Sequence, residues 1–167
     1  MRNLLTALLT TGALLGAAGG ASAGTATTTF TVTATVNTNC RVSAAPLTFN
    51  YTPGLGDVTN STTVTVNCTK GTAFNTALTA GLTTGSSIAQ RLLNDGAAGD
   101  TLQYNLYTSS ALTTPWGLTI NTDTVPGTGT GMGAAVTQTV YGKVVDSANQ
   151  GIPPGTYSDT ITVNVTY

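Results

Sequence analysis

Two stretches near the ends of the chain alternate between apolar and polar residues. The first is residues 27–36 (TTTFTVTATV), and the second is residues 157–167 (YSDTITVNVTY). Successive side chains of a β-strand point to opposite faces, so each stretch is predicted as a strand with one apolar and one polar face. Both stretches are rich in threonine and valine, which favour strands. The apolar faces consist of Phe30, Val32, Ala34 and Val36 in the first stretch and of Tyr157, Ile161, Val163, Val165 and Tyr167 in the second.

Shorter runs of the same kind fill the middle of the chain. Four of them are predicted as strands, at residues 62–68, 74–80, 102–107 and 136–145. Gly, Pro, Asn and Asp gather between the runs, as is typical of turns. Residues 87–93 are predicted as a helical turn and the glycine-rich residues 126–133 as a flexible loop. Counting a short strand after residue 40, six or seven strands separated by turns indicate an all-β, antiparallel sandwich.

The start of the chain has the features of a secretory signal peptide. Arg2 supplies a positive charge, an apolar run of Leu, Ala, Thr and Gly follows, and Ala21, Ser22 and Ala23 form a small-residue cleavage site. The predicted organisation is therefore a signal peptide at 1–23, an N-terminal strand and linker at 24–39, and one β-sandwich domain at 40–167. The mature protein is expected to be exported.

Charge and composition narrow the range of functions. The chain has a net charge of −1, only 7% charged residues, no His, and six acidic residues that are all Asp. Such a balance offers no electrostatic footprint for nucleic acid or an anionic membrane. So few charges suit a protein whose surface packs against copies or partners. Without His, Glu or paired carboxylates, the sequence predicts neither an enzyme nor a metal or cofactor site.

The two cysteines, Cys40 and Cys68, are predicted to form a disulfide. An even number of cysteines in an exported protein indicates pairing. The alternative, a metal site, is short of ligands because the chain has no His. Cys68 lies on the apolar parity of its predicted strand, and Cys40 shares its parity with Val42. The disulfide is therefore expected to join two strands inside the core.

The C-terminal strand raises two questions. Its apolar face is intact, yet no further stretch follows that would supply the next strand of the sandwich. In addition, Asp159 stands on the apolar parity of this strand. One interpretation places its carboxylate at the mouth of the strand, where a turn amide or water satisfies it. The other pairs it with a cation, for which Arg91 is the candidate.

Several segments carry a resemblance to a known family. They are TFTVTATVNTNC at 29–40, LTFNYTPG at 47–54, TVTVNCTKGTAF at 63–74, LQYNLYT at 102–108, VYGKV at 140–144 and PGTYSDTITVNVTY at 154–167, together with the Arg91-Leu92 and Trp116-Gly117 pairs. In order and cysteine spacing the chain resembles the spore coat protein U domain, the subunit family of archaic chaperone–usher pili. One departure is Asn50, where the family often has Gly.

The resemblance implies an incomplete immunoglobulin-like sandwich that a donor strand from another subunit completes. By that analogy Phe30, Val32, Ala34 and Val36 are the donor's plugs. The acceptor groove is walled by the strand after Cys40 and by Tyr157, Ile161, Val163, Val165 and Tyr167. The implied partners are related pilin subunits, a periplasmic chaperone and an outer-membrane usher. The implied location is the cell surface, and the implied role is adhesion or biofilm formation.

Two other functions are compatible with the sequence. Trp116 follows a proline and is a candidate sugar-stacking platform of a secreted carbohydrate-binding adhesin, although a lone Trp in a sandwich more often belongs to the core. The chain is also compatible with a spore or surface coat protein that does not polymerise. The glycine-rich residues 127–133 lack the Lys of a phosphate-binding loop and are interpreted as a plain loop.

Overall fold

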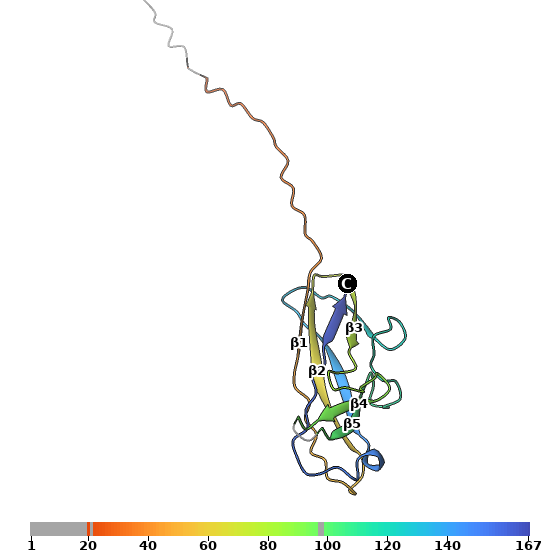
Figure 1. Ribbon diagram of the computed structural model, residues 1–167. Helices are drawn as coiled ribbons and strands as arrows, with labels where there is room; N and C mark the ends of the chain where they lie inside the picture. Colours follow the sequence, from red (N-terminus) through yellow and green to blue (C-terminus); the bar gives the residue numbers. More distant parts are fainter. Residues whose placement is uncertain (1–19, 21, 97–98) are drawn as a thin grey trace, which may run out of the picture. The chain divides into compact units, whose positions relative to one another are not determined.

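The computed structural model describes residues 20, 22–96 and 99–167, so nearly all of the predicted signal peptide lies outside the described residues. The chain divides into two units, residues 1–35 and 36–167. In the first unit no strand is assigned to the described residues, although the alternation at 27–36 predicts one. The second unit contains the whole sandwich (Figure 1).

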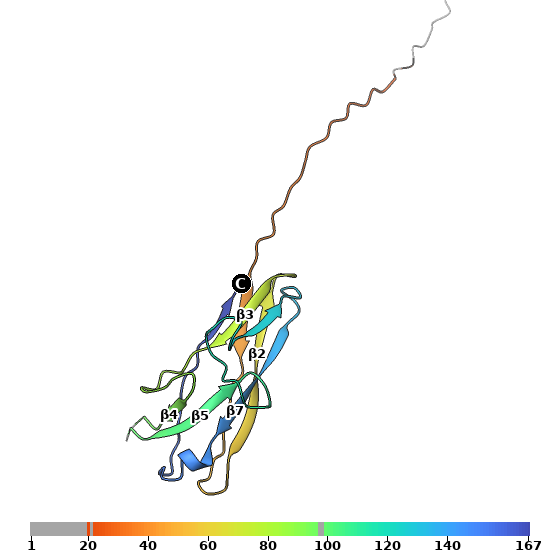
Figure 2. The same ribbon diagram turned by 90° about the vertical axis from the view of Figure 1, so that its right-hand side faces the viewer.

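The second unit is built from two antiparallel sheets that face each other (Figure 2). The larger sheet has the strand order β1-β2-β7-β5-β4, and the smaller sheet has the order β6-β3-β8. The strands of the larger sheet are β1 (Cys40–Ala44), β2 (Val58–Cys68), β7 (Val136–Val144), β5 (Thr101–Tyr107) and β4 (Arg91–Asn94). Those of the smaller sheet are β6 (Val125–Thr128), β3 (Ala73–Leu78) and β8 (Val163–Thr166). This is an immunoglobulin-like sandwich, as predicted.

The core lies between the sheets and follows the period of two that the sequence predicts. On β2 the buried side chains are Val64, Val66 and Cys68, while the residues between them are partly exposed. Phe74 and Leu78 of β3 meet them from the smaller sheet. Cys40 lies directly opposite Cys68 in the β1–β2 ladder, and the two residues form the predicted disulfide.

Two local predictions are wrong, the second of them only in part. Residues 87–93 do not form a helical turn: Ser87 and Gln90 exchange backbone hydrogen bonds that close a tight turn, and β4 begins at Arg91. Pairing of β4 with β5 overrides the helix-forming tendency of Arg and Leu. Among the described residues the helical structure is limited to a short 3-10 turn, η1 (Asp146–Ala148).

The second prediction, a loop at the glycine-rich residues 126–133, is wrong at its start but holds for residues 129–133, which belong to no strand. Its first residues belong to β6, which pairs with β3 so that Gly127 lies opposite Phe74. A Cβ atom at position 127 would overlap the Phe74 ring. The glycine that suggested a loop is therefore required because an aromatic ring packs against the strand.

Candidate functional site: an open groove between β1 and β8

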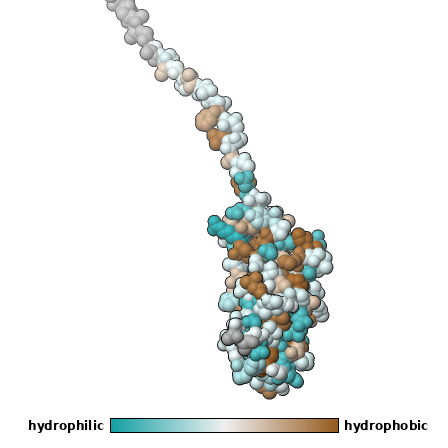
Figure 3. All heavy atoms as spheres, viewed as in Figure 1, coloured by the Kyte–Doolittle hydropathy of each residue, from teal (hydrophilic) through white to brown (hydrophobic). Residues whose placement is uncertain are grey.

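One side of the sandwich is flanked by a terminal strand from each sheet. β1 is the last strand of the larger sheet and β8 the last strand of the smaller one. Each has a partner on one side only, namely β2 for β1 and β3 for β8. The sandwich therefore has two adjacent edges at which a further strand can be added. In the space-filling view, apolar side chains reach the surface of the sandwich in several places (Figure 3).

The inner face of β1 is uncovered. Val42 lies opposite Val66, and Ala44 lies opposite Val64, so each pair shares a face of the sheet. Val64 and Val66 are completely buried, but Val42 is 42% exposed and Ala44 is also exposed. The side chains on this face of the sheet are therefore buried in the core at β2 but exposed at β1. In the part of the chain that the structure describes, the smaller sheet ends at β8 and offers no strand that covers them.

The edge of β8 that faces away from β3 presents backbone groups to which a further strand can bond. The backbone N–H of Thr79 donates to the carbonyl of Thr162, so Thr162 directs its backbone groups toward the β3 side. Neighbouring residues of a strand direct these groups to opposite edges. Ile161, Val163 and Val165 therefore direct theirs toward the outer edge. An added strand can bond to that edge.

A cavity of about 270 Å³ lies between the two edges. On one wall are Asp159, Ile161 and Val163. The other wall is formed within residues 44–49, the end of β1 and the chain after it, by Ala44, Ala45, Pro46, Leu47 and Phe49. The floor is apolar and comes from both sheets, with Val64, Leu78, Leu93, Leu106 and Val140 among its residues. We call this feature the groove.

The predicted acceptor residues differ in how they meet the groove. Ile161 and Val163 line it, whereas Tyr157 and Val165 are partly buried against the core and lie outside the cavity lining. Tyr167 is 57% exposed. The wall formed by residues 44–49 was not assigned in detail from the sequence. The alternation of Leu47, Phe49 and Tyr51 is the signal that would have identified it.

The predicted donor residues are highly exposed. Phe30 is 86%, Val32 79% and Val36 82% exposed. A phenylalanine and two valines in this state leave a large apolar area in contact with water. Their assignment as plugs, like that of the acceptor residues, remains a prediction.

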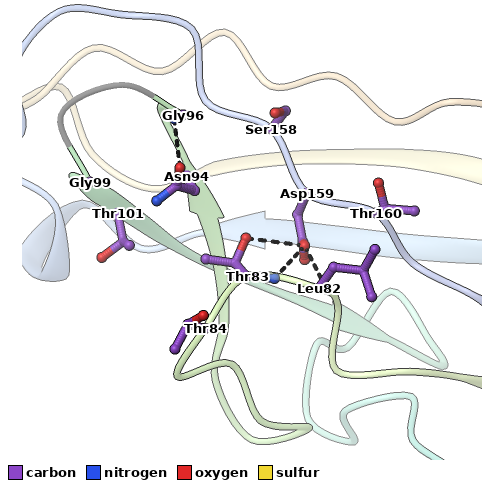
Figure 4. Close-up of a pocket in the computed structure, with 10 residues that line it drawn as sticks. All are labelled: Leu82, Thr83, Thr84, Asn94, Gly96, Gly99, Thr101, Ser158, Asp159 and Thr160. Carbon is purple, nitrogen blue, oxygen red and sulfur yellow. Dashed lines mark hydrogen bonds between the residues drawn. The ribbon is translucent and has the colours of Figure 1, made fainter.

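Asp159 lines the groove and is held there by a network of hydrogen bonds; those to Leu82 and Thr83 are drawn in Figure 4, which shows a neighbouring pocket that Asp159 also lines. Its Oδ1 accepts from the backbone N–H groups of Leu82 and Thr83, at 2.9 and 3.1 Å, and from the Thr83 hydroxyl at 3.2 Å. Its Oδ2 accepts from the Tyr104 hydroxyl at 2.8 Å. A Cβ atom at position 81 would overlap the carboxylate, and Gly81 has φ +101°, so a glycine is required there on both grounds. The interpretation that turn amides satisfy Asp159 is confirmed.

The alternative interpretation, a pair between Asp159 and Arg91, is wrong. The Arg91 guanidinium is fully buried and donates to the carbonyl oxygens of Leu78, Thr79 and Trp116 and to the side-chain oxygen of Asn105. Desolvation lowers the pKa of Arg91, and nearby acidic groups, including Asp159, oppose that shift. Burial and then the hydrogen bond to Asp159 raise the pKa of Tyr104 above its usual range. The phenol therefore stays protonated and can donate.

Trp116 is a core residue. It is completely buried, and its indole N–H donates to the carbonyl of Thr76 at 2.8 Å. A buried ring cannot stack on a sugar, so the carbohydrate-platform hypothesis for this residue is wrong.

A second polar cluster lies around η1 and does not contribute to the groove lining. Asp146 accepts from the Tyr51 hydroxyl and the Gly54 backbone N–H, both at 2.8 Å, and Lys143 pairs with Asp57 at 2.6 Å. The bond from Gly54, followed by the one from Tyr51, lowers the pKa of Asp146, and the contact with Lys143 lowers that of Asp57. Desolvation and the contact with Asp146 raise the pKa of Tyr51 to about 12. These contacts anchor the connection between β1 and β2.

Residues 20, 22–96 and 99–167 offer neither a metal centre nor a helical membrane span. They contain no group of three or more His, Cys, Asp or Glu side chains arranged to hold a metal ion. Within the same ranges, no helix is long and apolar enough to cross a membrane.

These features define an immunoglobulin-like sandwich with an open, apolar groove at two adjacent strand edges. Comparison with known families agrees: the Spore Coat Protein U domain matches residues 26–164. The chain belongs to this family, which confirms the resemblance seen in the sequence.

One solved structure illustrates the similarity in fold. It is the crystal structure of the CsuC–CsuE chaperone–tip adhesion subunit pre-assembly complex from archaic chaperone–usher Csu pili of Acinetobacter baumannii. The two chains superpose with a TM-score of 0.55 at 22% sequence identity, over 80% of this chain and 41% of the other. The chain thus spans less than half of that protein. A search of curated protein sequences found no match.

Proposed function

We propose that this protein is a structural subunit of a surface pilus that assembles by donor-strand exchange through a chaperone–usher pathway. The single observation that carries the proposal is the uncovered inner face of β1 next to the open edge of β8. A sandwich with this gap leaves Val42 and Ala44 exposed beside an unpaired strand edge, which favours aggregation unless a strand fills the gap. Adding a strand from another chain is an established mode of recognition.

The N-terminal segment of a second copy is the proposed donor. Its plug residues Phe30, Val32, Ala34 and Val36 alternate in the way that a strand in the groove requires. Burying the large plugs contributes roughly 1.5–3 kcal/mol each, which amounts to about 5–10 kcal/mol for the segment. Backbone bonds to the open edge of β8 add about 0.5–1.5 kcal/mol apiece.

Direction favours a donor from another copy. The missing strand of such a sandwich runs antiparallel to β8 and parallel to β1. The linker of residues 37–39 spans only about 10 Å when extended. Folding back over this linker would place the segment antiparallel to its own β1. A head-to-tail contact between copies does not close on itself, so the product is a fibre.

The remaining roles follow from the same proposal. Before assembly a periplasmic chaperone occupies the groove, and at an outer-membrane usher the donor segment of the next subunit replaces it. The similar Acinetobacter protein was solved in complex with a chaperone, which supports this scheme. The fibre is displayed at the cell surface and serves adhesion or biofilm formation. The role is structural, without catalysis or a cofactor.

A self-complemented chain tests the proposal. In this variant residues 24–36 are removed and a flexible linker followed by a copy of residues 25–37 is added after Tyr167. We expect a soluble monomer that folds without a chaperone, because the added strand reaches the groove in the required direction. The matched control carries the same extension with Phe30→Asp and Val32→Asp in the copy, which places charges where water cannot solvate them.

The comparison is made by gel filtration and denaturant unfolding. The control, like the simple deletion of residues 24–36, is expected to aggregate or to unfold at much lower denaturant concentration. If the simple deletion is instead a monomer as resistant to denaturant as the self-complemented chain, the sandwich is already complete and the proposal is wrong.

A further inference from the structure

The groove is not uniform along its length. Part of its lining is apolar: Ile161, Val163 and Leu78 line it from the side of the smaller sheet, where Val163 and Leu78 are direct cross-strand neighbours, and Val64 lines it from the larger sheet. At the end nearest residue 159 the lining changes to a carboxylate and a phenol, because Asp159 and Tyr104 both belong to it. A strand lying in the groove therefore has an apolar cavity beside one part and the polar side chains of Asp159 and Tyr104 beside another.

The Asp159 carboxylate is held in place from several directions. Four donors bind it, two of them backbone N–H groups, and Gly81 packs directly against its oxygens. The Tyr104 ring in turn packs against Phe49 of the opposite wall, with ring centroids 6.3 Å apart. Moving the carboxylate aside would break several hydrogen bonds at once. An incoming side chain must therefore fit the space that Asp159 leaves.

We propose that Asp159, supported by Tyr104, sets the register of the donor strand by accepting only its smallest plug, Ala34. This inference rests on the proposed function. An antiparallel donor with Ala34 opposite Asp159 has Val32 opposite Ile161 and Phe30 opposite Val163. The two large plugs then enter the apolar cavity, and the methyl group lies beside the carboxylate.

The neighbouring registers are less favourable for a definite reason. Because side chains of a strand alternate, the donor can shift only in steps of two residues if its apolar face is to stay inward. A shift in one direction places Val36 opposite Asp159 and the small Ala34 opposite Ile161, where it leaves the cavity unfilled. A shift in the other direction places Val32 opposite Asp159. Both shifts press a branched apolar side chain against a fixed carboxylate.

The proposed register also accounts for the rest of the N-terminal segment. Thr28 then lies opposite Val165 and Ala26 opposite Tyr167. Neither Val165 nor Tyr167 lines the cavity, so that part of the wall has no space to fill. Small residues are thus placed beside wall residues that do not line the cavity, and Phe30 is placed beside Val163, which does.

Cysteine cross-linking in the self-complemented chain measures the register directly. Residues opposite each other in an antiparallel pair have Cα atoms about 4.5–5.5 Å apart, which suits a disulfide. A two-residue shift adds about 7 Å along the strand. We expect Val32→Cys in the donor copy to form a disulfide with Ile161→Cys, identified by peptide mapping without reduction. Val32→Cys with Val163→Cys, and Phe30→Cys with Ile161→Cys, report the two shifted registers and are expected to stay unpaired.

Size substitutions give a second measurement that needs no new cysteine. Ala34→Leu in the donor copy should lower the melting temperature by about 3–10 °C, because the larger side chain meets the Asp159 carboxylate. If the register were shifted so that Ala34 faced Ile161, the same substitution would fill the cavity and raise the melting temperature. The matched control is Thr28→Leu, on the same face but next to Val165, which should leave the melting temperature unchanged or raise it.

Combining the substitutions separates a register role from a merely structural one. In an Asp159→Ala background, Ala34→Leu should no longer lower the melting temperature. The Val32–Val163 cross-link should then appear beside the Val32–Ile161 one, since the obstacle that excludes the shift is gone. A variant that has only lost stability would keep a single cross-link.

The possible failures are distinguishable. If the self-complemented chain is no more stable than its control with Asp in the donor copy, no strand enters the groove and the proposed function fails. If that chain is stabilised but its disulfide joins a shifted pair, or none of the three pairs, the donor binds and the proposed register is wrong. An unchanged single cross-link in Asp159→Ala likewise overturns the role of Asp159.

Discussion

The two alternating segments of this chain have the same pattern and different surroundings. Residues 157–167 keep their odd-numbered side chains partly buried from Tyr157 to Val165, with exposed side chains between them. Residues 27–36 have an equally regular apolar face, yet Phe30, Val32 and Val36 are each about four-fifths exposed. The difference shows that alternation specifies which face of a strand is apolar, whereas burial of that face depends on a partner. In the proposed fibre the two segments are partners from different copies.

The first prediction compares the two segments by introducing the same substitution, valine to aspartate, into each of them. In the self-complemented chain with its native N-terminal segment retained, Val163→Asp should reduce the free energy of unfolding by about 4 kcal/mol or more, because a carboxylate enters the apolar wall beside Leu78. Val32→Asp in the native segment should change it by less than about 0.5 kcal/mol, since the groove is already filled. Urea unfolding of both variants makes the measurement. Equal effects would mean that the native segment packs against its own sandwich.

The second prediction concerns the boundary between the two regions. Cys40 opens β1 and is bonded to Cys68 of β2, 28 residues further along. Replacing both cysteines by Ser in the self-complemented chain should cost about 3 kcal/mol in the chain-entropy account. Unfolding of the oxidised protein and of the double variant under identical conditions tests it. Free thiols in folded, exported wild-type protein would contradict the disulfide itself.

The third prediction has the smallest effect and uses pH. Tyr104 has a raised pKa in the folded protein, whereas residues 25–38 carry no titratable side chain. The stability that the protonated phenol contributes is complete below about pH 10 and is lost as the pH rises further. Above about pH 10, Tyr104→Phe should therefore lose less stability with rising pH than the parent.

The control for this measurement is needed because Tyr51 and Tyr157 also have raised pKa values. Some alkaline destabilisation should remain in Tyr104→Phe. At pH 7 the free energy of unfolding of Tyr104→Phe should be about 1 kcal/mol lower than that of the parent, which is the contribution of one hydrogen bond. An identical pH profile in parent and variant would show that Tyr104 does not titrate with folding.

Local patterns were sufficient for much of the fold. The alternation at residues 62–68 and 136–145 predicts β2 and β7, and the structure extends β2 only at its start, to Val58. A strand with one buried face can be recognised from the sequence, because its buried apolar residues recur at every second position. The disulfide was predictable as well, since the chain contains just two cysteines and both fall on apolar parities.

The predictions failed where contacts distant in sequence determine the local structure. Arg91 and Leu92 favour a helix locally, but pairing with Tyr104 and Gln103 of β5 makes them a strand. Gly127 suggests a loop until the Phe74 ring is known to pack on it. In both cases a neighbour about 10 to 50 residues away supplies the deciding interaction, and no local pattern contains it.

For the site, the alternation of residues is sufficient to predict that one segment has a spare apolar face and that Asp159 stands on the apolar side of the last strand. The surroundings of these residues depend on the folded arrangement of both sheets. This arrangement brings the Leu82 and Thr83 amides and the Tyr104 hydroxyl to Asp159, buries Trp116, and forms the second groove wall from residues 44–49. Periodicity fixes the direction of a side chain through the geometry of one strand. The shape of a groove instead depends on how two sheets pack, and that packing sums contacts along the whole chain.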